Sequence, residues 1–168
     1  RAALEEKEEL EINQMSNLWD LSRLQPNNTV VLDGETIPAL FWNAVEKRGP
    51  KVWMRQKEYG IWRTWTWNQT ADAVREIAGG LMSLGFEPGQ TASILSNTLI
   101  EWVLADLAVL STGGVSNGIY PTDAASQVQY LCEDSRTTLL FVEDDEQLDK
   151  ALEVRDQLPL LRKIVVFD

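Results

Sequence analysis

The chain has 168 residues, close to the usual size of one domain and long enough to bury a substantial core. Its formal net charge of -11 at pH 7 would repel nucleic-acid phosphates and anionic membrane surfaces, so neither is expected as the principal partner. Glu101 and Asp106 interrupt the longest apolar run, which falls short of the roughly 18 residues that a membrane-spanning helix needs. The single cysteine, Cys132, excludes an internal disulfide, and no secretory signal is visible, so the cytoplasm is the expected compartment.

Residues 1–35 differ in character from the rest of the chain. They begin with the acidic stretch RAALEEKEELE, whose Leu4 and Leu10 are compatible with a helix, and they continue as polar sequence. We expect an acidic, loosely attached leader here. The first residue is not Met, which indicates either processing or, as we favour, a piece of a longer protein. Residues 36–168 are expected to form the N-terminal α/β portion of a larger domain.

The ordered pattern begins at Thr36. The stretch TIPALFWNAVEKRG predicts a helix, with Pro38 in its first turn and Gly49 just past its end. The segments KVWMRQK and IWRTWT then predict two antiparallel strands, with Gly60 in the turn between them. Together they indicate a helix and a short hairpin ahead of the main fold.

Three tryptophans lie close together at the end of this hairpin. Because side chains alternate along a strand, Trp62 and Trp65 are expected on opposite faces, and Trp67 is expected in the first turn of the next helix. A ligand-stacking platform would need the three rings on one exposed side. We therefore interpret Trp62, Trp65 and Trp67 as packing residues of the hairpin and the helix.

Strands and helices alternate after the hairpin. The pairs Thr66 with Gln69 and Thr98 with Glu101 have the spacing of capping boxes, and Gly85 is expected to end the first of the two helices. We expect strands at residues 91–95, 113–119, 138–142 and 163–167, and further helices that begin at Thr122 or Asp123 and at Asp144.

This order of elements predicts an α/β fold. Short, continuously apolar strands separated by helices of about 10 to 15 residues indicate right-handed crossovers onto a parallel sheet. We expect that sheet to carry helices on both faces. The hairpin adds a short antiparallel piece.

Residue content excludes several kinds of catalytic site. The chain has no histidine, which removes histidine-based triads and imidazole metal ligands, and one cysteine cannot form a thiolate zinc site. Neither GxxxxGK[ST] nor GxGxxG occurs, and the pairs Gly79-Gly80 and Gly113-Gly114 have no lysine close behind them. We expect close backbone packing at Gly79-Gly80, which lies inside a predicted helix. The serines considered as nucleophiles all lack a base: Ser93, Ser96 and Ser111.

Two more features are interpreted structurally. The acidic run from Glu143 to Glu146 lacks the alternate spacing of a calcium loop and stands at a predicted helix start, where carboxylates satisfy free N–H groups. We therefore favour helix capping over a metal site. Cys132 shares the apolar side of its helix with Val128 and Leu131, so we expect a small buried core residue and not a reactive thiol.

An ordered series of motifs extends over about residues 36–168. It consists of TWTW, Gly85 followed by Pro88-Gly89, the segment from Asn97 to Trp102, Gly114 leading to Tyr120-Pro121-Thr122, and Leu158-Pro159 before the last strand. This series resembles the N-terminal part of the acyl-adenylate-forming (AMP-binding) enzymes. GIYPT and the ending LPLLRKIVVFD favour a resemblance to the long-chain fatty acyl-CoA synthetases within that family.

The resemblance implies that the parent protein activates a fatty acid with ATP and Mg2+ to an acyl-adenylate and transfers the acyl group to coenzyme A. The family's Ser/Thr/Gly-rich phosphate loop and catalytic lysine have no counterpart in this chain. No catalytic, cofactor-binding or metal-ligating residue is therefore assigned, and the chain alone is expected to be an inactive scaffold. The motif residues interpreted as framework are Trp65, Trp67, Gly114, Tyr120 and Thr122.

The resemblance also implies the partners of the parent protein, and two other interpretations of its function stay open. The partners are the remainder of the enzyme chain and the fatty acid, ATP and coenzyme A of the parent. Self-association through an uncovered sheet edge is expected, and peripheral contact with a membrane is compatible with a lipid substrate. One alternative is a parent that acts on aryl or medium-chain acids. The other is a free-standing α/β module that binds a partner protein, which the lack of phosphate-binding groups motivates.

Overall fold

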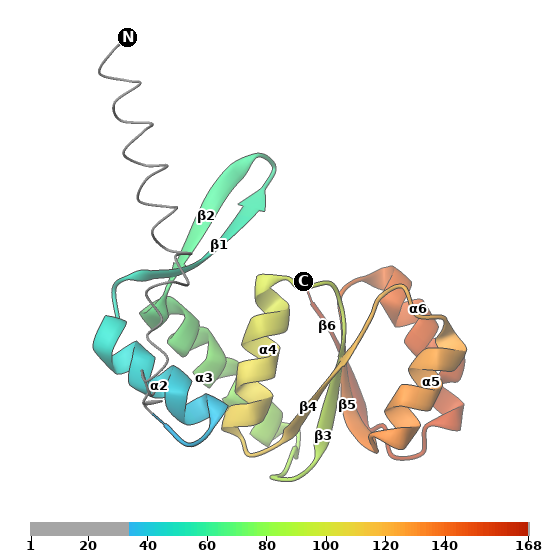
Figure 1. The fold of residues 1–168 in the computed structure, drawn as a ribbon. Coiled ribbons are helices and arrows are strands. Elements are labelled where there is room, and N and C mark those ends of the chain that lie inside the picture. The colour runs from blue at the N-terminus through green and yellow to red at the C-terminus, as the bar shows by residue number, and fades with distance from the viewer. Residues whose placement is uncertain (1–33, 168) are drawn as a thin grey trace, which may run out of the picture. The chain divides into compact units, whose positions relative to one another are not determined.

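The computed structural model describes residues 34–167, so nearly all of the predicted leader, residues 1–35, lies outside the described part (Figure 1). In chain order the elements are α2 (Ile37–Arg48), β1 (Val52–Glu58), β2 (Ile61–Thr66), α3 (Trp67–Ser83), β3 (Thr91–Leu95), α4 (Ile100–Ser111), β4 (Val115–Ile119), α5 (Ala125–Asp134), β5 (Thr137–Val142), α6 (Asp145–Val154), a 3-10 turn (Arg155–Gln157) and β6 (Lys163–Val166).

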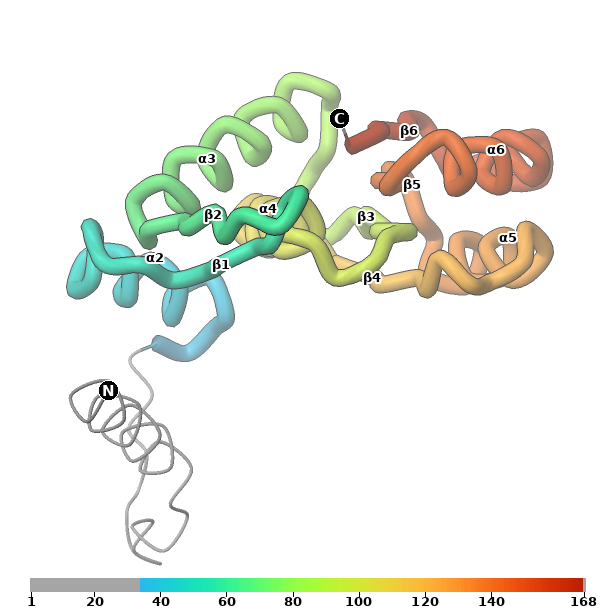
Figure 2. The backbone as a smooth tube through the Cα atoms, turned by 90° about the horizontal axis from the view of Figure 1, so that it is seen from above, coloured from blue at the N-terminus to red at the C-terminus, as the bar shows by residue number. Residues whose placement is uncertain are grey.

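Four strands form a parallel sheet in the order β4-β3-β5-β6, and β1 and β2 form a separate antiparallel pair. Helices α2, α3 and α4 cover one face of the sheet around a core that includes Ile94 and Phe141. Helices α5 and α6 cover the other face, around Leu140 and Val142. Figure 2 shows α2, α3 and α4 on the side away from α5 and α6. The predicted α/β fold with a hairpin is confirmed.

Strand β3 illustrates why the strands of the parallel sheet have continuously apolar sequences. It lies between β4 and β5, and every residue from Thr91 to Leu95 is buried. Ile94 faces the α2–α4 core and Leu95 faces the α5–α6 core. Because both faces are covered, neither needs the polar side chains that an exposed face would carry.

The boundaries of α3 follow the sequence. The Thr66 hydroxyl accepts a hydrogen bond from the Gln69 N–H at 3.2 Å, and the Gln69 side-chain oxygen accepts one from the Thr66 N–H at 2.9 Å. The first predicted capping box is therefore confirmed. Gly85, at φ 80°, ends the helix, and the Phe86 N–H donates to the Leu81 carbonyl at 3.0 Å, as in a Schellman motif.

The second predicted capping box, Thr98 with Glu101, is wrong. Helix α4 begins at Ile100, and its N-cap residue Leu99 makes no side-chain cap bond. Instead the Ile100 N–H donates to the Gln56 side-chain oxygen of β1 at 3.0 Å. A side chain brought in by the hairpin thus caps the helix, which no local spacing could predict.

The predicted start of α5 at Thr122 or Asp123 is also wrong. Ala124 is the N-cap residue, and the helix runs from Ala125. The Ala124 N–H donates to the Gln127 side-chain oxygen at 2.9 Å. The glutamine three residues on therefore supplies the capping bond, so the cap itself does not need a polar side chain.

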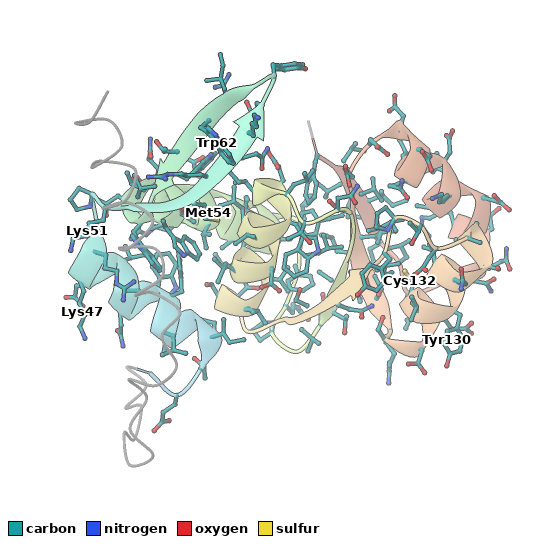
Figure 3. The ribbon with its side chains drawn as sticks, turned by 45° about the horizontal axis from the view of Figure 1, so that its top comes forward. Lys47, Lys51, Met54, Trp62, Tyr130 and Cys132 are labelled. Atoms are coloured by element: carbon teal, nitrogen blue, oxygen red, sulfur yellow. The ribbon has the colours of Figure 1, made fainter. Side chains whose placement is uncertain are left out.

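The hairpin closes with a two-residue turn at Tyr59 and Gly60, both at positive φ, as predicted for Gly60. Trp67 is 8% exposed and stacks on Trp53 with ring centroids 4.3 Å apart, which confirms its packing role. Trp65 also packs against this core. The packing interpretation of Trp62 is wrong, because this residue is 62% exposed on the hairpin (Figure 3).

Gly114 and the pair Gly79-Gly80 differ in how closely other atoms surround them. A side chain at Gly114 would place its Cβ 2.5 Å from the Phe86 ring and 3.1 Å from Val109, so close packing requires glycine there. At Gly79 and Gly80 a Cβ would meet no heavy atom within 4 Å among the described residues. The predicted close backbone packing at Gly79-Gly80 is therefore wrong for this part of the chain.

We predict that Gly114→Ala lowers the free energy of unfolding by about 1–3 kcal/mol, because the ring of Phe86 must move to admit the methyl group. Gly79→Ala is the matched control, and it should raise that free energy by up to about 1 kcal/mol, since alanine favours a helix interior. Urea denaturation measures both. Equal effects of the two substitutions would contradict the packing role of Gly114.

Candidate functional site

The topology of the sheet indicates where a ligand would bind. The connection after β3 crosses one face of the sheet through α4, and the connection after β5 crosses the other face through α6. In open parallel sheets, ligands bind outside the carboxyl ends of strands at the point where such connections diverge. The crevice between the ends of β3 and β5 is therefore the first place to look for a site.

A carboxylate of the chain itself occupies this crevice. The Glu143 Oε2 atom accepts hydrogen bonds from the Asn97 N–H at 2.6 Å, the Asn97 side-chain amide at 3.0 Å and the Ser96 hydroxyl at 3.2 Å. The Glu143 N–H in turn donates to the Leu95 carbonyl at 3.1 Å. We call this arrangement the Glu143 clasp. It ties the end of β5 to the loop after β3 and places a negative charge where a phosphate would need positive charge.

An open groove lies beside the clasp, at the carboxyl ends of β3 and β4. It has a cavity volume of about 390 Å³ and is lined by Ser96, Asn97, Thr98, Trp102, Tyr120 and Pro121, among others. Trp102 lies over the exposed backbone of Gly118, where a Cβ would stand 3.6 Å from the ring. The groove offers hydroxyl, amide and aromatic groups, and it could hold a neutral or planar ligand.

One lysine fixes the outer wall of this groove. The Lys150 ammonium of α6 donates to the Pro121 carbonyl at 2.6 Å and to the Gln147 side-chain oxygen at 3.1 Å, and it pairs with Glu146 at 3.2 Å. These contacts hold the loop after β4 against α6. Tyr120, on that loop, is 77% exposed.

The acidic residues 143–146 have two different structural roles. Asp144 caps α6 by accepting from the Gln147 N–H at 3.0 Å, and Asp145 and Glu146 lie in the first turn. Helix capping is confirmed for Asp144. Asp145 and Glu146 lie where a carboxylate favours the helix dipole, and Glu143 belongs to the clasp. Within residues 34–167, no group of three or more acidic or cysteine side chains is arranged to hold a metal ion.

The other residues singled out in the sequence are held in structural contacts. Ser93 shares a 2.6 Å hydrogen bond with Thr137, and Ser111 accepts from the Trp42 indole at 3.3 Å. Cys132 is 2% exposed in the α5–α6 core, as predicted (Figure 3). Burial raises the pKa of its thiol above the ordinary 9.0, although hydrogen bonds with Thr137 and Ser93 act in the opposite direction.

Solved structures show which class of protein has this fold. The chain superimposes on an anthranilate CoA ligase, AuaEII, crystallised with anthranoyl-AMP, with a TM-score of 0.70 and 24% identity over 76% of this chain and 24% of that one. It also superimposes on acetoacetyl-CoA synthetase from Streptomyces lividans, with a TM-score of 0.69 and 24% identity over 75% of this chain and 21% of that one. This chain therefore has the fold of a part of these two proteins.

Sequence comparison identifies the family. The family described as AMP-binding enzyme matches residues 31–168, and the chain belongs to this family. It is 32% identical over 145 residues to a protein named long-chain-fatty-acid–CoA ligase ACSBG2 from Xenopus laevis, covering 86% of this chain and 20% of the relative. It is 36% identical over 106 residues to long-chain-fatty-acid–CoA ligase FadD15 from Mycobacterium bovis, covering 63% of this chain and 18% of that relative. The chain thus spans about a fifth of the length of these relatives.

Between residues 34 and 167, no helix is both long enough and apolar enough to cross a membrane.

We predict that Glu143→Ala lowers the free energy of unfolding by about 1–2 kcal/mol, because the Asn97 and Ser96 donors lose a half-buried charged acceptor. Glu146→Ala is the control, since its exposed ion pair with Lys150 should contribute less than about 1 kcal/mol. Urea denaturation gives both values. If the two variants are equally stable, the clasp does not hold the β3 and β5 ends together.

The raised pKa of Cys132 predicts a pH dependence. As the pH rises above 9.0, the thiol of the unfolded chain loses its proton before the thiol of the folded chain does. The contribution of the Cys132 thiol to the free energy of unfolding is therefore complete below the ordinary pKa and is lost as the pH rises through the folded pKa. The slope is at most about 1.4 kcal/mol per pH unit. The difference in the free energy of unfolding between the wild type and Cys132→Ala should therefore narrow as the pH rises above 9.0. A constant gap in thermal or urea unfolding would contradict the prediction.

Proposed function

We propose that the chain is the N-terminal part of an ATP-dependent acyl-CoA synthetase that activates a long-chain fatty acid as its acyl-adenylate and transfers it to coenzyme A. The observation that carries this proposal is the family match over residues 31–168. The names of the relatives from Xenopus laevis and Mycobacterium bovis support the long-chain substrate. Because the chain spans about a fifth of these relatives, the activity belongs to the parent protein and not to this part alone.

Within the parent, we assign the chain a scaffolding role. The residues at the topological switch point do not fit the phosphates of ATP, because Glu143 places a carboxylate in the crevice and already accepts from the Asn97 N–H and side-chain amide. Among residues 34–167, no cationic side chain lines the open groove beside the clasp. We therefore infer that ATP, Mg2+ and coenzyme A are bound by other parts of the parent, and that the 168-residue chain is inactive by itself.

The proposal extends to organisation and location. We propose residues 1–35 as an acidic leader and residues 36–168 as the N-terminal α/β portion of the family domain, and the family match begins at residue 31, inside the proposed leader. The parent acts in the cytoplasm, which the single buried cysteine supports. Its lipid substrate would bring it into peripheral contact with membranes.

The test compares the intact gene product with the 168-residue chain. The intact protein should form acyl-CoA from hexadecanoate in the presence of ATP, Mg2+ and coenzyme A, and it should do so faster than from octanoate or benzoate. The measurement is the thioester product, separated by chromatography. A preference for benzoate or octanoate would replace the long-chain substrate with an aryl or medium-chain one, and no thioester from any acid would refute the ligase.

The second part of the test uses the 168-residue chain by itself. Isothermal titration with ATP and Mg2+ should give no saturable heat, because the described crevice holds no group that compensates phosphate charge. Saturable binding of ATP would show that a nucleotide site lies within these residues, and the scaffolding role would then be wrong.

A further inference from the structure

The hairpin of β1 and β2 is attached to the rest of the fold at one end. Near its base, Trp53 and Trp65 pack against the α2–α4 core, and the Gln56 side chain caps α4. Its far end, residues 57–62, extends beyond the helices (Figure 1). We call this far end the hairpin tip.

The hairpin tip exposes three large apolar or aromatic side chains close together in the chain. Tyr59 is fully exposed, Ile61 is 70% exposed and Trp62 is 62% exposed. Exposed apolar side chains that are scattered singly need no explanation, whereas a contiguous group marks a surface that meets a partner or a membrane. The tip is therefore a candidate interaction surface.

Tyr59 is unfavourable for the hairpin itself. Its φ of 48° lies in the left-handed region, where a two-residue turn prefers asparagine, aspartate or glycine. The fully exposed ring offers no burial in return. Residues held in such conformations are concentrated at functional sites. The stability of the fold therefore does not explain a tyrosine at this position.

Basic side chains flank the exposed rings. Lys57 lies opposite Trp62 in the strand register, with its Nζ atom 6.0 Å from the centroid of the ring, and Arg55 lies on the same face. Glu58, the one acidic residue of the two strands, is paired with Arg63. The hairpin thus has an excess of positive charge, although the whole chain carries -11. Because salt screens charges beyond about 8 Å, this local excess governs what the tip contacts.

We propose that the hairpin tip inserts into the head-group region of a lipid bilayer that contains anionic phospholipids. Tyrosine and tryptophan favour this region, because the ring is apolar while the hydroxyl or indole N–H stays hydrated. Ile61 adds apolar area, and the ammonium of Lys57 reaches lipid phosphates while its stem stays beside the rings. A protein partner is the other occupant that an exposed tip could have, and the measurements distinguish the two.

This inference deepens the peripheral membrane contact of the proposed function, because it names the surface that makes the contact and the lipid charge that it needs. It rests on the proposed function only for the reason to meet a membrane, which is the lipid substrate. The exposure of the tip, the backbone conformation of Tyr59 and the charge of the hairpin are independent of the reaction.

Vesicle flotation of the intact gene product tests the tip. The protein should float with vesicles of equal parts phosphatidylcholine and phosphatidylserine, and it should bind phosphatidylcholine vesicles at least about fivefold more weakly, because each basic side chain near an anionic surface contributes about fivefold. Trp62→Thr, which keeps a residue that favours strands, should weaken binding to the anionic vesicles at least about fivefold.

Tyr130→Gln is the matched control, since it removes another exposed ring, on α5 and away from the hairpin (Figure 3). It should bind the anionic vesicles like the wild type. Absence of vesicle binding by the intact protein, or equal binding of Trp62→Thr and Tyr130→Gln, would overturn the proposal.

Tyr59→Asn separates a membrane role from a structural one. Asparagine suits the left-handed conformation better than tyrosine, so the melting temperature of the intact protein should stay the same or rise. Binding to the anionic vesicles should nevertheless fall at least about fivefold, because the interfacial ring is lost. A lower melting temperature with unchanged vesicle binding would make Tyr59 a structural residue and contradict the proposal.

Fluorescence quenching locates the inserted ring. Phospholipids brominated on their acyl chains quench tryptophans that enter the bilayer, and Trp62→Phe removes this one indole but keeps an apolar ring. The intact wild type should lose fluorescence on brominated vesicles, and Trp62→Phe should bind equally but lose much less. Equal fractional quenching of the two proteins would show that another part of the molecule enters the bilayer.

The outcomes distinguish this inference from the proposed ligase. Acyl-CoA formation from hexadecanoate dissolved in detergent tests the ligase without a bilayer, and Trp62→Thr should leave that rate unchanged. Vesicle binding through the tip by a protein that forms no acyl-CoA would support the inference and refute the ligase. If Trp62→Thr instead dissociates an oligomer in sedimentation and still binds vesicles, the tip is a protein interface and the inference is wrong.

Discussion

Burial of both faces of the parallel sheet is the constraint on which the rest of this structure depends. Strand β3 has neighbours on both edges and helices over both faces, so all five of its residues are buried. The crossovers must then send α4 to one face and α5 and α6 to the other. That division makes the connections after β3 and β5 diverge, and it creates the crevice at their carboxyl ends.

The crevice is where such folds usually bind ligands, yet here Glu143 closes it. Its carboxylate satisfies the Asn97 and Ser96 donors that a phosphate would otherwise use. Lys150 is likewise engaged with the Pro121 carbonyl. The polar groups at this edge therefore hold loops in place, as the proposed scaffolding role expects.

The predictions from sequence were correct where the partners are close along the chain. The capping box of Thr66 and Gln69 spans three residues, and Gly60 and Gly85 need only their own backbone conformation. They failed where the partner is distant. Gln56, which caps α4, lies 44 residues before Ile100, and Glu143 lies 46 residues after Asn97. Trp62 shows the limit of alternation along a strand, because the alternation separates two faces but does not indicate whether either face is covered.

By itself, the sequence determined the α/β class, the order of the elements and the resemblance to the AMP-binding enzymes, because periodicity and ordered motifs are properties of neighbouring residues. It also determined that neither a histidine site nor a disulfide can exist in this chain. Only the tertiary structure decided that Glu143 joins Asn97 across the crevice and that Gln56 caps α4. These features depend on sheet register and helix placement, which bring together groups that lie far apart in the chain.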